Sequence, residues 1–205
     1  DLRTKGSGNL GATNVVRVLG IRVGLAVFAV DMLKGALPVA FLPAATSGTL
    51  APTWLMIIYG AAAIVGHVRP VWLGFAKGGK GVATACGVFL ALTLIPTLFA
   101  LAAFLVTLGA TGYVSLGSLV AAAALPVLVA SAYGVPSVLF GVSVAIGVFV
   151  FWTHRANIGR LHRGEESRFS RLGALGAPVG VTLAALVTAA GTAWQKKLRL
   201  TGRPA

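Results

Sequence analysis

The sequence predicts an all-α, polytopic integral membrane protein with about six transmembrane helices. Hydrophobic residues make up 57% of the 205 residues and charged residues only 10%, against roughly a quarter in soluble domains. No Asp, Glu, Lys or Arg occurs between Lys80 and Arg155, and this stretch is long enough for several crossings of about 20 residues each. The remaining charges gather in short segments beside apolar runs, as expected for the loops of membrane proteins.

The first two predicted spans lie before residue 66. One apolar run covers residues 23–43 and is interrupted only by Asp31 and Lys34. These two side chains are three positions apart on one helix face, so they can pair. A second apolar run covers residues 54–65. A basic, glycine-rich loop follows at 66–81.

The uncharged stretch divides at Pro96, at residues 112–117 and at residues 134–136. Glycine and proline at these points predict helix breaks. The loops on both sides of the stretch are basic and should therefore be cytoplasmic, which requires an even number of crossings between them. Four helical pieces satisfy this condition, at about 82–95, 97–111, 117–133 and 136–153.

The two ends of the chain differ from this core. Residues 1–9 are polar and glycine-rich, and we expect that a preceding helix is absent from this sequence. Residues 172–194 are weakly apolar and precede a basic tail, so they either cross the membrane or lie at its interface. We predict a membrane domain at 1–171 with an appended segment at 172–205.

The charge balance of +13 comes from 17 basic and four acidic residues. Nucleic-acid binding is disfavoured because these charges lie beside apolar runs and not over a water-facing surface. Cys86 is the lone cysteine, and only three histidines are present. The sequence therefore predicts neither a disulfide framework nor a metal site, and no cofactor.

The first segment with chemical potential is residues 6–14 together with Arg17, the N-terminal glycine segment. Its glycines allow backbone N–H groups to approach an anion, and an arginine fork suits phosphate. A flexible loop capped by Asn and Ser is the alternative. The candidate phosphate-binding residues are Ser7, Gly8, Asn9, Thr13, Asn14 and Arg17.

The second segment contains residues 77–81, the lysine–glycine loop, with Lys77, Gly78, Gly79 and Lys80. It leads into an apolar helix, whose N-terminus favours anions. The spacing is not that of a Walker motif. A loop that merely sets topology is the alternative, although such a loop would not need the two glycines between the lysines. His67, just upstream, is expected to be structural.

Two further polar groups border the uncharged helices. Ser118 ends the sequence YVSLGS at 113–118, where a hydroxyl can bind substrate or simply its own backbone. His154 and Asn157 are three positions apart, so on a helix Asn157 could orient the His154 ring. Polar groups at this depth are functional candidates, with an interfacial helix end and snorkelling arginines as the alternative.

Taken together, these motifs resemble the bacterial membrane glycerol-3-phosphate acyltransferases that use acyl phosphate as donor, the PlsY family. The resemblance covers about residues 1–171. It is carried by GSGNLGATNVVR, by DMLKG at 31–35, by GHVRPVWLGFAKGGKGVATACG at 66–87, by YVSLGS and by the HRANI segment. The family implies seven transmembrane helices, of which this chain would supply six.

The resemblance implies transfer of a fatty acyl group from acyl phosphate to the 1-hydroxyl of glycerol 3-phosphate, the first acylation of bacterial phospholipid synthesis. By motif match, Ser7, Gly8 and Asn9 line a phosphate pocket with Arg17. Lys80 holds the acyl phosphate. The remaining matched residues position the acceptor or the reacting groups, namely Ser118, His154 and Asn157. Either the donor's phosphate or His154 takes the proton.

The resemblance also implies a bacterial inner-membrane location with the site on the cytoplasmic side, and a soluble enzyme that supplies acyl phosphate. Two departures from the family pattern stand out. Ala156 occupies a position where the family commonly has Glu, and Arg69 one where Phe or Tyr is common. A transporter of phosphorylated or anionic solutes is the alternative, disfavoured because transporters place their charges near the membrane midplane.

Overall fold

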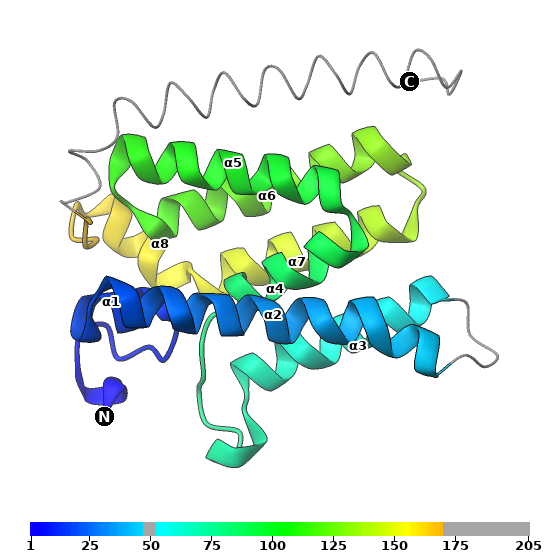
Figure 1. Cartoon of the computed structure of the whole chain (residues 1–205). Helices are drawn as coiled ribbons and strands as arrows, with labels where there is room; N and C mark the ends of the chain where they lie inside the picture. Colours follow the sequence, from blue (N-terminus) through cyan, green and yellow to red (C-terminus); the bar gives the residue numbers. More distant parts are fainter. Residues whose placement is uncertain (47–51, 170–205) are drawn as a thin grey trace. The chain divides into compact units, whose positions relative to one another are not determined.

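The computed structural model describes residues 1–46 and 52–169, and every regular element in them is helical (Figure 1). The chain forms two compact units, Asp1–Thr97 and Leu98–Ala205. The all-α class predicted from composition is thus confirmed. The predicted apolar segment at 172–194 lies outside the described residues.

The first unit begins with a short 3-10 helix and a two-turn helix, and then contains a long helical hairpin. Helix α3 folds back along α2, and a loop containing η2 leads from α3 to α4 (Figure 1). Its elements are η1 (Leu2–Thr4), α1 (Ala12–Leu19), α2 (Ile21–Ala45), α3 (Pro52–Val68), η2 (Val71–Leu73) and α4 (Val82–Leu92).

The second unit is built from the following apolar helices and a short basic helix at the end. These are α5 (Leu94–Thr111), whose first turn still belongs to the first unit, α6 (Val114–Tyr133), α7 (Val138–Thr153) and α8 (Arg155–His162). The segment after α8 returns to the α5–α6 connection, where the Phe169 amide donates to the Gly112 carbonyl at 2.9 Å.

The predicted division of the uncharged stretch into four helices is confirmed, with one shifted boundary. The break between the first two pieces falls at Thr93 and not at Pro96. Pro96 lies in the first turn of α5, where a backbone N–H has no intrahelical partner, so its missing N–H does not weaken the helix.

The six apolar helices are not equally long. Helices α2, α5 and α6 are long and apolar enough to cross a membrane, and so is α3 together with the following η2, over Pro52–Leu73. Helices α7 and α8 pass the same test together as one span bent by 59°. Helix α4 has 11 residues, which rise about 16 Å against a hydrocarbon thickness of about 30 Å. By length and composition, the described residues therefore contain four segments that could span a membrane, or five if α7 and α8 form one span, against the six predicted.

Helices α2 and α4 pack through glycine. A Cβ added at Gly35 would lie 2.3 Å from the Thr84 carbonyl oxygen, and one at Gly87 would lie 1.9 Å from the Met32 carbonyl oxygen. Small residues at such crossings allow membrane helices to approach backbone to backbone. This contact fixes the start of α4 beside the middle of α2.

In the second unit, α6 and α7 also meet at a glycine. A Cβ at Gly147 would lie 3.1 Å from the Ala122 carbonyl oxygen. The buried residues of α7 recur at Ser143, Gly147 and Val150, a spacing that places them on one face. This face ends at the break between α7 and α8, which positions His154.

Candidate functional site

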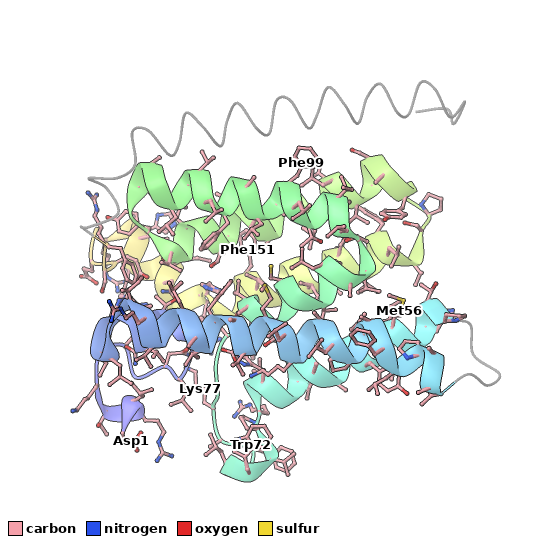
Figure 2. The ribbon with its side chains drawn as sticks, viewed as in Figure 1. Asp1, Met56, Trp72, Lys77, Phe99 and Phe151 are labelled. Carbon is pink, nitrogen blue, oxygen red and sulfur yellow. The ribbon has the colours of Figure 1, made fainter. Side chains whose placement is uncertain are left out.

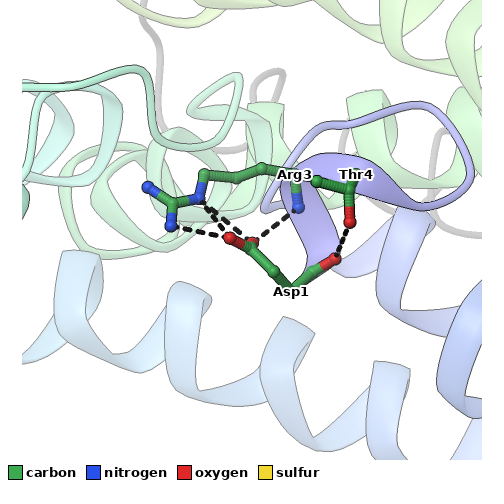
Figure 3. Close-up of polar contacts among 3 residues, drawn as sticks. All are labelled: Asp1, Arg3 and Thr4. Atoms are coloured by element: carbon green, nitrogen blue, oxygen red, sulfur yellow. Dashed lines mark hydrogen bonds and ion pairs between the residues drawn. The ribbon is translucent and has the colours of Figure 1, made fainter.

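The N-terminal glycine segment begins with a compact turn. Arg3 donates from Nε and Nη2 to the Asp1 carboxylate, and the Thr4 hydroxyl donates to the Asp1 carbonyl oxygen at 3.0 Å (Figure 3). Gly6 and Gly8 then adopt φ values of 60° and 67°, which L-residues with a side chain rarely adopt. These glycines turn the chain toward α1.

Asn14 holds this turn on helix α1. Its side chain is 1% exposed and accepts a hydrogen bond from the Ser7 amide at 2.8 Å. It also donates to the carbonyl oxygens of Lys5 at 3.0 Å and Leu2 at 3.3 Å. Asn14 therefore orders the backbone of the segment, while the Ser7 side chain stays exposed.

The other predicted residues of this segment lie on or beside α1. Thr13 is half-buried in the first turn of the helix, and Arg17 is exposed in its last turn. Asn9 lies just before the helix, and its Oδ1 accepts a hydrogen bond from the amide of the N-cap residue Gly11 at 2.8 Å.

The lysine–glycine loop is hydrogen-bonded to the end of α3. The Gly78 amide donates to the Val68 carbonyl at 2.9 Å, and Gly78 and Gly79 are both buried. Lys77 is exposed on the connection between α3 and α4 (Figure 2), whereas Lys80 is half-buried directly before α4.

The two glycine-containing segments meet, although about 70 positions separate them in sequence. Asn9 Nδ2 donates to the Gly78 carbonyl oxygen at 3.4 Å. A Cβ at Gly11, the N-cap of α1, would lie 4.0 Å from the Gly79 Cα. The starts of α1 and α4 therefore approach one another, and helix N-termini favour anions through their backbone N–H groups and dipoles.

Thr84 adds a hydroxyl in the first turn of α4. It is fully buried, and within the described residues its Oγ1 has no hydrogen-bond partner. A buried polar atom without a partner is rare in native proteins and calls for an explanation. Thr84 lies within the motif at 66–87 but was not among the predicted site residues.

His154 occupies the break between α7 and α8 in the second unit. It is 3% exposed, and its Nδ1 lies 2.8 Å from the Val150 carbonyl oxygen. A carbonyl only accepts, so Nδ1 carries the hydrogen, and Nε2 of the neutral ring is an acceptor. The break between α7 and α8 thus positions this histidine, and the hydrogen bond to the Val150 carbonyl fixes its tautomer.

Asn157 lies one turn further on, in α8, and is 5% exposed. Its Nδ2 donates to Glu166 Oε1 at 2.6 Å. The same carboxylate accepts from Ser115 Oγ at 2.9 Å and from Arg160 Nε at 2.7 Å. Glu166 therefore connects α6, α8 and the segment after α8.

The pKa of Glu166 reflects opposing influences. Burial raises the pKa, but hydrogen bonds from Asn157, Arg160 and Ser115, with the charge of Arg160, together hold it below its usual range. The group is therefore a carboxylate at neutral pH. It can orient Asn157 but cannot donate a proton.

Ser118 is 4% exposed on α6. Its hydroxyl donates to the Val114 carbonyl at 2.9 Å, which is the bond to its own backbone that the sequence left open as an alternative. A hydroxyl oxygen engaged in this way still accepts hydrogen bonds.

The predicted site residues thus fall into two sets. The phosphate-binding candidates all lie in the first unit, where Asn9 contacts Gly78. Ser118, His154 and Asn157 belong to the second unit. Their meeting in one site stays a prediction. Among residues 1–46 and 52–169, no three His, Cys, Asp or Glu side chains group closely enough to hold a metal ion.

Sequence reasoning missed the role of Glu166. A signal for this role was present in the sequence. The chain has only four acidic residues, and a carboxylate among apolar helices is retained only where it has partners. The predicted pairing of Asp31 with Lys34 is confirmed, at 2.5 Å. The sequence did not reveal that His67 joins this pair, with Nδ1 2.8 Å from Lys34 Nζ.

The chain is similar to known proteins in sequence and in overall structure. A family model described as glycerol-3-phosphate acyltransferase matches residues 1–164. The glycerol-3-phosphate acyltransferase of Geobacter sulfurreducens is 50% identical over 169 residues, which cover 82% of this chain and 84% of the relative. That of Synechococcus elongatus is 44% identical over 176 residues, covering 83% and 82%.

Two solved structures are also similar. Both are crystal structures of PlsY (YgiH), an integral membrane glycerol 3-phosphate acyltransferase. The glycerol 3-phosphate form has a TM-score of 0.76 and 39% identity, and covers 85% of each chain. The lysophosphatidic acid form has a TM-score of 0.74 and 38% identity, and covers 83% of this chain and 84% of the other.

Proposed function

The chain belongs to the glycerol-3-phosphate acyltransferase family and is a multi-pass membrane acyltransferase, and we propose that its acyl donor is an acyl phosphate. The acceptor would be the 1-hydroxyl of sn-glycerol 3-phosphate, and the products lysophosphatidic acid and phosphate. Two related PlsY structures are described as glycerol 3-phosphate and lysophosphatidic acid forms, which supports this acceptor and product. Transport of anionic solutes is not favoured by these relatives.

The observation that carries the proposal is the contact between the two glycine-containing segments. Asn9 donates to the Gly78 carbonyl, and Gly11 lies against Gly79. This joins two helix N-termini with the cations of the lysine–glycine loop. Backbone N–H groups and cations together suit a phosphorylated ligand, and both proposed substrates carry phosphate.

The reaction needs one bond formed and one broken. The acceptor's hydroxyl oxygen attacks the acyl carbon, and the bond from that carbon to the phosphate oxygen breaks. The hydroxyl proton ends on the departing phosphate, either directly or through His154 Nε2. Phosphate leaves readily, so positioning and electrostatic stabilisation can supply much of the acceleration.

The chain's own residues divide this work in the proposal. Lys80 holds the donor phosphate and stabilises the charge that develops on the acyl oxygen. Arg17 binds phosphate through its planar fork, beside the backbone around Ser7 and Gly8. The second unit's residues orient the acceptor, namely Ser118, His154 and Asn157. Thr13 and Lys77 complete the phosphate site, Asn14 contributes by holding the backbone around Ser7 in place, and no cofactor takes part.

The membrane supplies the remaining requirement. An acyl chain partitions into hydrocarbon, gaining about 0.8 kcal/mol for each buried CH₂ group, so the donor arrives from the lipid side. We propose a bacterial inner-membrane location with the site on the cytoplasmic side. The basic segments border the apolar runs, and loops rich in Lys and Arg are typically cytoplasmic. A soluble enzyme would then supply the acyl phosphate.

Product analysis tests the proposal directly. Membranes containing the full chain, given a synthetic acyl phosphate and radiolabelled glycerol 3-phosphate, should form lysophosphatidic acid on thin-layer chromatography. Lys80→Ala and Arg17→Ala should each lower kcat/KM by about 100-fold, as expected when a charged group that stabilises the transition state is removed. Arg22→Ala, at an exposed position at the start of α2, is the matched control.

Two outcomes would contradict parts of this proposal. If Lys80→Ala and Arg17→Ala both keep the wild-type rate, the site assignment is wrong. If sealed vesicles accumulate labelled glycerol 3-phosphate without forming acyl product, the transporter alternative replaces the enzyme.

A further inference from the structure

We infer that Asp31, Lys34 and His67 form a positioning cluster for the lysine–glycine loop. The inference rests on the proposed function for its catalytic meaning, because the loop contains Lys80. None of the three residues is assigned to the reaction above. His67, expected from the sequence to be structural, would act through the loop.

The cluster joins α2 to the end of α3. Lys34 Nζ lies 2.5 Å from Asp31 Oδ1 and 2.8 Å from His67 Nδ1, and His67 Nδ1 lies 3.3 Å from the same Asp31 oxygen. The side chains of Asp31 and His67 are 10% and 7% exposed. A buried carboxylate is retained where partners satisfy it, and here the partners come from two helices.

These contacts determine which histidine nitrogen faces outward from the cluster. A lysine ammonium group only donates, so the neutral His67 ring must accept at Nδ1 and carry its hydrogen on Nε2. A protonated ring would donate from Nδ1 to Asp31 and would still carry a hydrogen on Nε2. In both states the cluster orients the ring with Nε2–H directed away from it.

The Nε2 edge of the ring packs on the lysine–glycine loop. A Cβ at Gly79 would lie 2.0 Å from His67 Nε2, and a Cβ at Gly78 would lie 2.3 Å from the His67 carbonyl oxygen. The Gly78 amide also donates to the Val68 carbonyl at 2.9 Å. Two successive glycines are therefore needed, because the His67 ring and the His67 carbonyl group occupy the space that side chains at 79 and 78 would fill.

The consequence is a chain of contacts from α2 to the loop. Asp31 and Lys34 hold the ring of His67, the ring limits where Gly79 can run, and Gly79 immediately precedes Lys80. A shift of about 1 Å in a group that positions substrate can reduce a rate by about 100-fold. Loss of the cluster should therefore displace Lys80 without removing it.

A purely structural role predicts something different. If His67 only filled space between helices, its loss would reduce the amount of folded protein. The remaining molecules would keep the wild-type KM. A side chain at Gly79 would still collide with the ring, but the coupling would appear in the amount of folded protein and not in the kcat/KM of the folded molecules.

A double-mutant cycle separates the two roles in full-chain protein reconstituted in lipid vesicles. His67→Ala, Gly79→Ala and the double variant would be assayed for kcat and for KM toward glycerol 3-phosphate and acyl phosphate. Gly79→Ala should lower kcat/KM by about tenfold or more in the wild-type background, but by less than about threefold in His67→Ala, because contacting residues are not additive. Equal factors in the two backgrounds would overturn the inference.

Two variants complete the cycle. Gly109→Ala on α5 is the matched glycine control, since no atom of residues 1–46 and 52–169 lies within 4 Å of its added Cβ, and it should leave kcat/KM within about twofold. Asp31→Asn keeps the shape of the side chain but removes its charge. It should raise the KM for a phosphorylated substrate in the wild-type background and add little in His67→Ala. If His67→Ala fails to fold, Asp31→Asn alone tests the inference through the KM and through the exchange of the Gly78 amide.

Hydrogen exchange gives a readout that does not depend on activity. The Gly78 amide, within a peptide covering residues 76–83, should exchange at least about tenfold faster in His67→Ala and Asp31→Asn than in wild type or Gly109→Ala. Unchanged exchange would overturn the inference whatever the kinetics show. A wild-type protein that forms no lysophosphatidic acid would instead refute the proposed function, and exchange would still decide the positioning role.

Discussion

The two units of the molecule build their polar regions in different ways. In the first unit, backbone groups made accessible by glycine dominate, and the lysine–glycine loop packs on the His67 ring. In the second unit, side chains dominate, and Glu166 accepts hydrogen bonds from three donors on α6 and α8. Each unit contains one buried acidic residue, Asp31 or Glu166.

The difference shows two solutions to the same physical problem. Polar groups surrounded by apolar helices need partners, because an unsatisfied group in a low-dielectric environment costs several kcal/mol. The first unit satisfies this need largely with hydrogen bonds to backbone groups at closely packed glycines. It should therefore be sensitive to added side-chain volume. The second unit depends on one carboxylate, so it should be sensitive to the loss of a single charge.

The largest expected effect is at Glu166. Glu166→Gln keeps the size of the side chain but turns an amide N–H₂ toward one of its donors, and breaking a buried, hydrogen-bonded ion pair typically destabilises by about 3 kcal/mol. Activity should fall by about 100-fold because Asn157 loses its orientation. Thermal unfolding in detergent and product formation in lipid vesicles measure the two effects.

Glu165→Gln is the matched control, because this neighbouring carboxylate is 55% exposed and pairs with Arg163 at the surface. Exposed pairs contribute at most about 1 kcal/mol, so its stability and rate should stay near those of wild type. Equal losses in the two variants would show that net charge, and not the network around Glu166, matters in the second unit.

A smaller effect is expected from added volume in the first unit. Gly87→Ala places a Cβ 1.9 Å from the Met32 carbonyl oxygen, so α4 must move away from α2. Overpacking of this kind destabilises by about 2 kcal/mol. The unfolding midpoint should drop clearly relative to Gly109→Ala, and a midpoint equal to that control would mean that α2 and α4 are not in close contact.

The smallest expected effect is on the dependence of stability on pH. The folded state holds the pKa of Glu166 below its usual value, so its stabilising contribution is complete above the unfolded pKa of about 4.3. It is lost as the pH falls through the lower folded pKa. Unfolding midpoints measured on acidification should decline less for Glu166→Gln than for wild type, and parallel curves would contradict the prediction.

Much of the fold could be predicted because hydrophobic runs and glycine or proline breaks are local signals. The runs at 23–43 and 54–65 correspond to α2 and α3. The boundary at Thr93 could not be predicted, because a proline is tolerated in the first turn of a helix and so does not mark its start uniquely. The shortness of α4 was hidden for the same reason.

The candidate site was only partly predictable. Glycines next to lysines gave the lysine–glycine loop, and spacing along one helix gave the pairing of Asp31 with Lys34. Contacts between distant segments leave no local pattern, so the bond from Asn9 to Gly78 and the partners of Glu166 could not be predicted, although the rarity of acidic residues singled Glu166 out. Asn14 was expected to bind phosphate, yet its side chain is occupied with the backbone around Ser7.

The packing of α4 on the middle of α2 bears on how the acceptor would enter in the proposed reaction. Met32 lies ten residues beyond the exposed Arg22 on α2, which corresponds to about 15 Å along a helix axis. Irregular backbone at such a depth in a bilayer needs a water-filled recess. Through such a recess the hydrophilic acceptor would reach the start of α4, while the hydrophobic donor would arrive from the lipid.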